Sequence, residues 1–264
     1  MNAGAWNSLE RELDAWASAG RVAALWWRDD DAIDTTARLA RLVALGAAQS
    51  VPLMLAVIPA TATAALASAL VSAPVSALAD VKGAVLQHGY AHINHAPPGL
   101  PKSELSNARP LADRLADLEA GRARLGAMVG TRLLPVLVPP WNRIDDDLVD
   151  ALAGLGYRVL STFRPRPRGF ARPGLRQVNT HVDLIDWAGT RQFIGTDAAV
   201  AALVDHLAAK RAALAAGQDD LEPTGILSHH LAMDEPCWNF LESLFRLTRG
   251  HRGARWLDAA EIFQ

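Results

Sequence analysis

The sequence predicts an α/β protein with parallel strands, because short apolar segments of strand length alternate with longer segments of helical pattern. Six or seven such pairs indicate a closed or nearly closed barrel. A length of 264 residues is common for an α/β barrel, so we expect a single domain over residues 1–264. Several apolar segments run into polar motifs, and the loops after the strand C-termini carry the active site in such barrels.

The composition narrows the class of protein. Half of the residues are apolar, a fifth are charged and the net charge is −2. This balance argues against a disordered chain and against a general nucleic-acid binder. The one cysteine, Cys237, cannot form an internal disulfide, and the early charges at Glu10, Arg11 and Glu12 leave no apolar signal-peptide core. We therefore expect a cytoplasmic protein.

The helical spacing of Trp6, Leu9, Leu13 and Trp16 predicts an amphipathic helix within residues 1–20, packed on the barrel without a chemical role. No charged residue occurs between Arg41 and Asp80, but three prolines interrupt this stretch, so it is not expected to span a membrane. The expected strands are 22–27, 51–58, 84–86, 133–138, 157–160, 225–228 and 255–257. The expected helices between and after them are 35–45, 61–71, 109–129, 146–155, 196–216, 236–248 and 258–263.

The first of these strands ends in an arginine and three aspartates, Arg28 to Asp31. Three successive carboxylates repel one another, whereas a helix N-cap needs only one, and Asp34 alone could cap the next helix. A cation, most plausibly a metal ion, would relieve the repulsion.

Three of the eight histidines fall within residues 87–95, directly after a strand. His88 and His92 are four residues apart, a spacing that lets two imidazoles bind one metal ion. A polar loop that is merely rich in histidine is the alternative.

Three further motifs also follow apolar segments. They are Pro139-Pro140-Trp141, Asp186-Trp187 and His229-His230. Five arginines between residues 164 and 176 indicate an exposed loop, or else a rim that attracts an anionic substrate.

Together, the segments at 28–31, 88–92, 139–141, 186–187 and 227–229 resemble the five motifs of the polysaccharide deacetylase family, in the family's order. This is the NodB-homology, chitin deacetylase-like group of carbohydrate esterases. The resemblance implies a distorted (β/α)7-type barrel and a divalent ion, usually zinc, bound by Asp-His-His. It also implies hydrolysis of an N- or O-acetyl group on a sugar.

The resemblance assigns His88 and His92 as metal ligands. The acidic motif has two possible registers, Asp29/Asp30 or Asp30/Asp31. We prefer Asp30 as the catalytic base and Asp31 as the ligand, because Ala32 then stands at the small position where the family has glycine. Val138 stands where the family has an arginine that pairs with the base.

That missing arginine leaves the base without a counter-ion. Arg28 and Arg143 are the candidates to replace it. Side chains two apart on a strand share a face, so we expect Arg28 to point into the barrel and pair with Asp30.

The remaining roles follow the same resemblance. The backbone N–H of Trp141 would stabilise the oxyanion, and His229, oriented by Asp186, would protonate the leaving amine. The expected substrate contacts are Trp187, Tyr90, Asn142 and His95. His230 has no assigned role.

The expected function is therefore a metal-dependent hydrolase that removes an acetyl or similar acyl group from an N-acylated sugar. Two alternatives remain. One is a metal-dependent amidase or deformylase acting on a non-carbohydrate amide, and the other is a catalytically inactive barrel that only binds saccharide. The expected partner is a small molecule or saccharide, and the sequence leaves the oligomeric state open.

Overall fold

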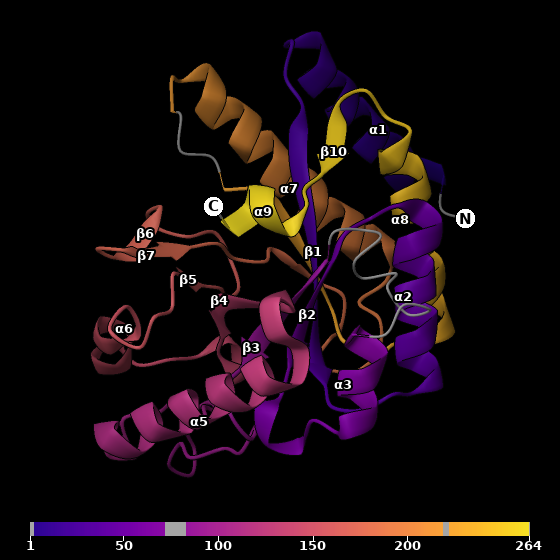
Figure 1. Cartoon of the computed structure of the whole chain (residues 1–264). Helices are drawn as coiled ribbons and strands as arrows, with labels where there is room; N and C mark the ends of the chain where they lie inside the picture. Colours follow the sequence, from indigo (N-terminus) through magenta and orange to yellow (C-terminus); the bar gives the residue numbers. More distant parts are fainter. Residues whose placement is uncertain (1–2, 72–82, 219–221, 264) are drawn as a thin grey trace.

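The computed structural model describes residues 3–71, 83–218 and 222–263, and it has the alternating order that the sequence predicts (Figure 1). The strands are β1 (Ala23–Ala32), β2 (Leu53–Val57), β3 (Ala84–His88), β4 (Leu133–Val138), β5 (Val159–Leu160), β6 (Phe170–Arg172), β7 (Leu175–Gln177), β8 (Val182–Asp183), β9 (Thr224–Ser228) and β10 (Ala254–Trp256). The α-helices are α1 (Ala3–Ser18), α2 (Ala37–Gln49), α3 (Ala64–Val71), α5 (Leu111–Val129), α6 (Asp146–Leu152), α7 (Thr196–Ala215), α8 (Glu235–Arg249) and α9 (Ala259–Phe263). Short 3-10 turns lie at Pro59–Thr61, Gly130–Arg132 and Pro140–Asn142.

The strands form one curved sheet in the order β6-β7-β5-β4-β3-β2-β1-β9-β8, with β10 paired to the beginning of β1. All pairs are parallel except the antiparallel hairpin of β6 and β7. The sheet is not closed. Beyond β5 and β7, Phe163 and Thr180 form an isolated parallel bridge that continues the pairing of these two strands, and the Thr180 N–H donates to the Thr162 carbonyl at 3.0 Å. The predicted parallel barrel is thus confirmed in a distorted, open form.

Strand β1 separates two apolar regions, because its side chains alternate between the faces of the sheet. Trp26 packs with Met54 and Leu86 among the buried residues enclosed by the sheet. Trp27 points to the other face, where its ring meets Phe245 of α8 at 4.8 Å. Figure 1 shows α2 and α8 side by side on this flank. Since both faces of β1 are buried, Arg28, which follows these tryptophans, enters a dry environment.

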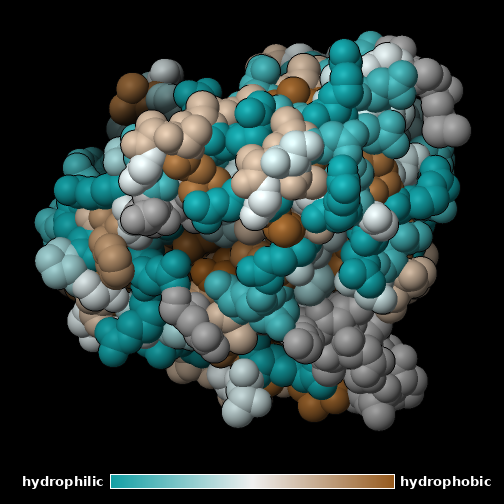
Figure 2. All heavy atoms as spheres, turned by 90° about the horizontal axis from the view of Figure 1, so that it is seen from above, coloured by the Kyte–Doolittle hydropathy of each residue, from teal (hydrophilic) through white to brown (hydrophobic). Residues whose placement is uncertain are grey.

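The first and last helices cover parts of the barrel. Helix α1 packs along α7 through the fully buried Leu9 and Leu13, and Glu12 pairs with Arg211. Helix α9 lies at the end of the sheet where β1 begins, and its Phe263 meets Trp26 edge-on at 5.8 Å. Figure 2 looks onto this end of the molecule, where hydrophilic atoms predominate and hydrophobic atoms lie deep in a central hollow.

Several local predictions were inaccurate. β1 continues through the acidic run instead of ending at Trp27. Thr36, not Asp34, caps α2 by accepting the Leu39 N–H at 3.0 Å, while Asp34 accepts from Thr63. Strands β6, β7 and β8 were not predicted, because they are only two or three residues long. No helix in the described part of the chain is long and apolar enough to cross a membrane.

Candidate active site

The end of β1 has an irregularity that changes the direction of one side chain. Its pairing with β2 shifts register between Asp29 and Ala32, and Asp31 has a left-handed backbone with φ 74°. Strict alternation would put Asp31 on the same face as Asp29. The bulge instead turns the Asp31 carboxylate towards the end of β3, as bulges near active sites often do.

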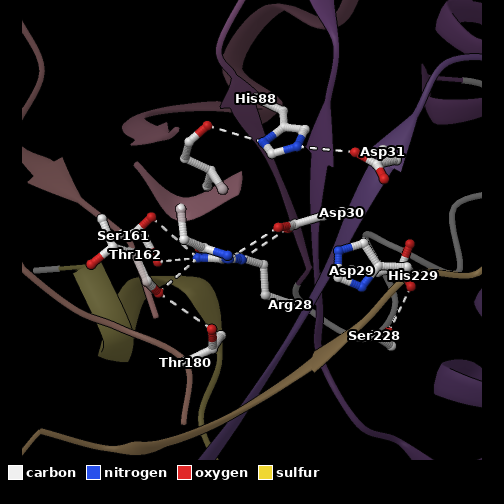
Figure 3. Close-up of polar contacts among 12 residues, drawn as sticks. Arg28, Asp29, Asp30, Asp31, His88, Ser161, Thr162, Thr180, Ser228 and His229 are labelled. Atoms are coloured by element: carbon white, nitrogen blue, oxygen red, sulfur yellow. Dashed lines mark hydrogen bonds and ion pairs between the residues drawn. The ribbon is translucent and has the colours of Figure 1, made fainter. Parts of the chain in front are cut away.

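The Asp31 carboxylate meets two imidazoles there, of which Figure 3 shows that of His88. Asp31 Oδ1 lies 3.1 Å from His88 Nε2 and 3.3 Å from His92 Nε2. One ligand atom from each residue falls within 4.8 Å of the others, and this is the only such group among the described residues. Metal–ligand bonds of about 2.0–2.2 Å in a tetrahedral site separate neighbouring ligands by roughly 3.3 Å. The three residues therefore fit one divalent ion and leave coordination positions for water and substrate.

Two features prepare this group for a cation. The Val138 carbonyl lies 3.0 Å from His88 Nδ1 and accepts its proton, so Nε2, which faces Asp31, is the nitrogen that would lose its proton to bind a metal. Burial alone would raise the pKa of Asp31, but the hydrogen bond from His88 and the charges of the nearby histidines hold that pKa well below its usual range. The ionised form of this carboxylate is thus favoured, as binding of a cation requires.

The loop that carries the two histidines is organised by Glu104. This buried carboxylate accepts the backbone N–H groups of Tyr90, Ala91 and His92 at 2.6 to 3.1 Å. A side chain at Gly89 would collide with Glu104 and Pro140, and the positive φ of Gly89 also favours glycine. Glu104 was not predicted, because no local pattern links it to a loop more than ten residues away.

Arg28 and Asp30 point into the barrel and form a fully buried ion pair (Figure 3). Arg28 Nε lies 2.9 Å from Asp30 Oδ1, and Nη2 donates to Oδ2 at 3.0 Å. The remaining guanidinium donors reach Ser161 Oγ at 2.7 Å and Asn142 Oδ1 at 2.7 Å. The structure thus brings together the predicted pair.

Arg143, the alternative counter-ion, donates to the Lys102 carbonyl at 3.0 Å and is exposed. This arrangement supports the Asp30/Asp31 register. Asp30 is the carboxylate paired with arginine, and Asp31 is the one that meets the histidines.

Asp29, the third carboxylate, lies on the face of β1 opposite to Arg28 and Asp30. It accepts from Ser228 Oγ at 2.6 Å and from the His230 backbone N–H at 3.0 Å, and its Oδ1 lies 2.5 Å from His230 Nδ1. Asp29 therefore holds the residues on either side of His229. This accounts for His230, to which the sequence assigned no role.

The carboxylate beside His229 is Asp183, not Asp186. Asp183 Oδ1 lies 3.7 Å from His229 Nδ1, a buried atom that forms no hydrogen bond within the described part of the chain. Asp186 instead accepts the N–H groups of Gly189 and Thr190 within its own turn. The prediction that Asp186 orients His229 is wrong, because Asp186 follows β8 and faces this turn, whereas Asp183 ends the strand beside β9.

Substitution of Asp183 and of Asp186 tests which of the two carboxylates acts on His229. We expect Asp183→Asn to lower kcat by at least ~10-fold, because a neutral amide cannot stabilise a protonated imidazole as a carboxylate does. The matched change Asp186→Asn keeps a turn acceptor and should leave kcat within about twofold of the wild type. Steady-state kinetics of both variants make the comparison, and an equal loss in the two would contradict the assignment.

The candidate groups converge on one cavity of about 300 Å³. It is lined by Asp30, Asp31, His88, His92, Trp141, Asn142, Arg143, Phe163, Asp183, Trp187 and His229. The backbone at Trp141 and Asn142 is left-handed, with φ 55° and 56°. In this turn the Asn142 and Arg143 N–H groups donate to the Pro139 and Pro140 carbonyls, whereas the Trp141 N–H has no backbone acceptor among the described residues and can donate to a ligand.

The four expected substrate contacts divide into two pairs. Trp187 is 45% exposed, lies edge-on to His229 at 4.8 Å and donates to Asp183 from Nε1. Trp187 and Asn142 line the cavity, as expected of substrate contacts. Tyr90 and His95 are not among the lining residues, so the structure does not support that role for them.

The sequence matches no protein-family model and no curated protein sequence. Solved structures are similar to it. The peptidoglycan N-acetylglucosamine deacetylase Bc1960 has 15% identity over 92% of this chain and 89% of its own, with a TM-score of 0.56. The peptidoglycan deacetylase PdaC from Bacillus subtilis has 10% identity over 91% and 90%, with a TM-score of 0.57. A family 4 acetyl xylan esterase from Clostridium thermocellum, solved with a cobalt ion, has 14% identity over 91% and 90%, with a TM-score of 0.53. The chain thus has the fold of the polysaccharide deacetylases and family 4 carbohydrate esterases.

Proposed function

We propose that this protein is a metal-dependent hydrolase that removes an acetyl or similar acyl group from the nitrogen of an acylated sugar. The observation that carries the proposal is the common cavity. A group that fits a divalent ion, a buried carboxylate held by arginine and a histidine held near a second carboxylate all line it. Its volume of about 300 Å³ is at the lower end of small-molecule sites, enough for one acyl group and part of a ring.

Asp31, His88 and His92 would hold the ion, with zinc as the first candidate from the mixture of nitrogen and oxygen ligands. When bound, the ion would lower the pKa of water towards roughly 7 and polarise the acyl carbonyl.

Asp30 is the proposed base. Arg28 and its hydrogen bonds hold this carboxylate in a fixed position at the wall of the cavity. Asp30 takes a proton from water as the water oxygen bonds to the acyl carbon. The Trp141 N–H then donates to the oxygen that becomes negative, a contact that strengthens as charge develops.

His229 is the proposed acid. Its imidazole lines the same cavity, next to Asp183 and Trp187. As the carbon–nitrogen bond breaks, His229 transfers a proton to the leaving nitrogen, and Asp183 stabilises the charged imidazole before that transfer. The products are a carboxylate and a free amine, and the ring of Trp187, which is 45% exposed, is available to the sugar ring.

The test is hydrolysis of small N-acetyl sugars by the metal-loaded protein, with acetate release as the readout. We expect Asp30→Asn and His229→Ala each to lower kcat/KM by at least ~100-fold while the bound metal is retained, because general acid and base catalysis typically contributes that much. The pH dependence of kcat/KM should be bell-shaped, since one group must be deprotonated and the other protonated.

Retention of near-full activity in either variant would remove the assigned role. Saccharide binding without any acetate release would favour an inactive binding barrel. Hydrolysis of simple non-sugar amides alone would favour an amidase.

A further inference from the structure

A second cavity, of about 810 Å³, adjoins the catalytic cavity, and Asn142 and Arg143 line both. We call it the side groove. Its wall includes the loop after the Trp141 turn, the start of α6 and the arginine-rich segment between β5 and β7. A substrate whose acyl group lies at the Asp31, His88 and His92 group would therefore extend past Asn142 into this groove.

Two arginines that line the side groove have no carboxylate partner among the residues that the structure describes. Arg143 and Arg168 line it, and each donates only to a backbone carbonyl, that of Lys102 at 3.0 Å and that of Ala171 at 3.3 Å. In residues 3–71, 83–218 and 222–263 neither guanidinium forms an ion pair with a carboxylate. The lining thus includes two guanidinium groups from different segments of the chain.

Of the two aspartates that line the groove, one is in an ion pair and the other keeps its charge. Asp146 pairs with Arg172, which also pairs with Asp150. Asp145 accepts the Asn107 backbone N–H at 2.6 Å. Of the five arginines between residues 164 and 176, only Arg168 and Arg172 line the groove, and Arg172 is neutralised. The lining thus carries three arginines and two aspartates, an excess of one positive charge.

We infer that the side groove binds a phosphate or diphosphate group of the substrate, so that the substrate is a phosphorylated N-acyl sugar and not a neutral polymer. This inference rests on the proposed function for the chemistry of the acyl group. A guanidinium binds phosphate through two parallel N–H···O bonds. Two guanidinium groups carry a charge of +2, which matches a phosphate of charge near −2 better than it matches a ligand with one carboxylate. The groove is larger than the catalytic cavity, so it has room for a phosphate and the group attached beyond it.

The experiment compares N-acetylglucosamine with N-acetylglucosamine 1-phosphate as substrates of the metal-loaded protein. We expect the phosphorylated sugar to have about a tenfold higher kcat/KM, mostly through KM, and this preference should weaken as salt is added. Arg143→Gln and Arg168→Gln should each reduce the preference about fivefold. Arg158→Gln is the matched control, because Arg158 is exposed just before β5 and does not line the groove. It should leave the preference unchanged.

Equal kcat/KM values for the two sugars, or a preference that all three variants leave intact, would overturn the inference. Hydrolysis of neither sugar would instead count against the proposed function. In that case calorimetric titration with N-acetylglucosamine 1-phosphate still tests the groove, because wild type should bind it about fivefold more tightly than either groove variant. Equal affinity would then reject the phosphate site. Trials with a nucleoside diphosphate sugar and a short prenyl diphosphate sugar distinguish the two sources of the phosphate.

Discussion

His92→Ala and His88→Ala are each expected to abolish tight binding of the divalent ion and to reduce hydrolysis by more than ~100-fold. Each substitution removes one of three ligand atoms that lie within 4.8 Å of one another, and two remaining ligands make a weak site. Elemental analysis after dialysis measures the bound metal. The two variants are complementary, because the His92 side chain is 24% exposed and its loss leaves the core intact, whereas His88 is buried.

His95→Ala is the matched control, since His95 lies on the same loop but does not line the cavity. It should bind metal like the wild type. A ligand that binds only the folded state at 100 times its Kd stabilises by about 2.7 kcal/mol. Zinc should therefore raise the Tm of the wild type and of His95→Ala but not of the other two variants. Full metal occupancy in both His88→Ala and His92→Ala would show that the ligand assignment is wrong.

Arg28→Met is expected to lower the free energy of unfolding by about 3–5 kcal/mol, because it leaves the buried Asp30 carboxylate without its partner. Methionine keeps much of the bulk and removes the charge. Urea unfolding measures the change. The same variant should lose kcat/KM, because the carboxylate of Asp30 no longer has two contacts that fix its position.

The double variant Arg28→Met with Asp30→Asn isolates the electrostatic part. An amide is far less costly to bury than an unpaired carboxylate, so the double variant should be more stable than Arg28→Met alone. Arg41→Met is the control, because Arg41 pairs with Glu235 at the surface, where ion pairs contribute only about 0–1 kcal/mol. If Arg28→Met lowers the free energy of unfolding no more than Arg41→Met does, the buried Arg28–Asp30 ion pair does not stabilise the fold as its burial indicates.

Both arrangements behind these predictions could be anticipated because they depend on short-range geometry. His88 ends β3 and His92 follows four residues later in the same loop. Their imidazoles are therefore restricted to neighbouring positions. Arg28 and Asp30 are two apart on β1, and the alternation of a strand puts both on one face. The apolar run of residues 133–138 was likewise sufficient to place β4 within its observed bounds.

Other features depend on contacts between segments far apart in the chain. Asp29 and Asp31 had the same local pattern, yet the bulge at the end of β1 sends Asp31 to the histidines while Asp29 meets His230, 201 residues away. Asp183 and Asp186 are both near a tryptophan, and only the pairing of β8 with β9 decides which carboxylate lies beside His229. Glu104 and the side groove have no local pattern at all.

The sequence by itself determined the α/β class, the parallel barrel, the pair of histidines and the partnership of Arg28 with Asp30. Each of these follows from periodicity and from spacing within one strand or loop, where covalent geometry limits the outcome. Only the tertiary structure decided which aspartate of the acidic run contacts the histidines, which carboxylate lies beside His229 and which cavities adjoin these residues. These features depend on which strands become neighbours in the sheet. The packing of the whole chain determines the strand order, so a local sequence pattern does not predict it.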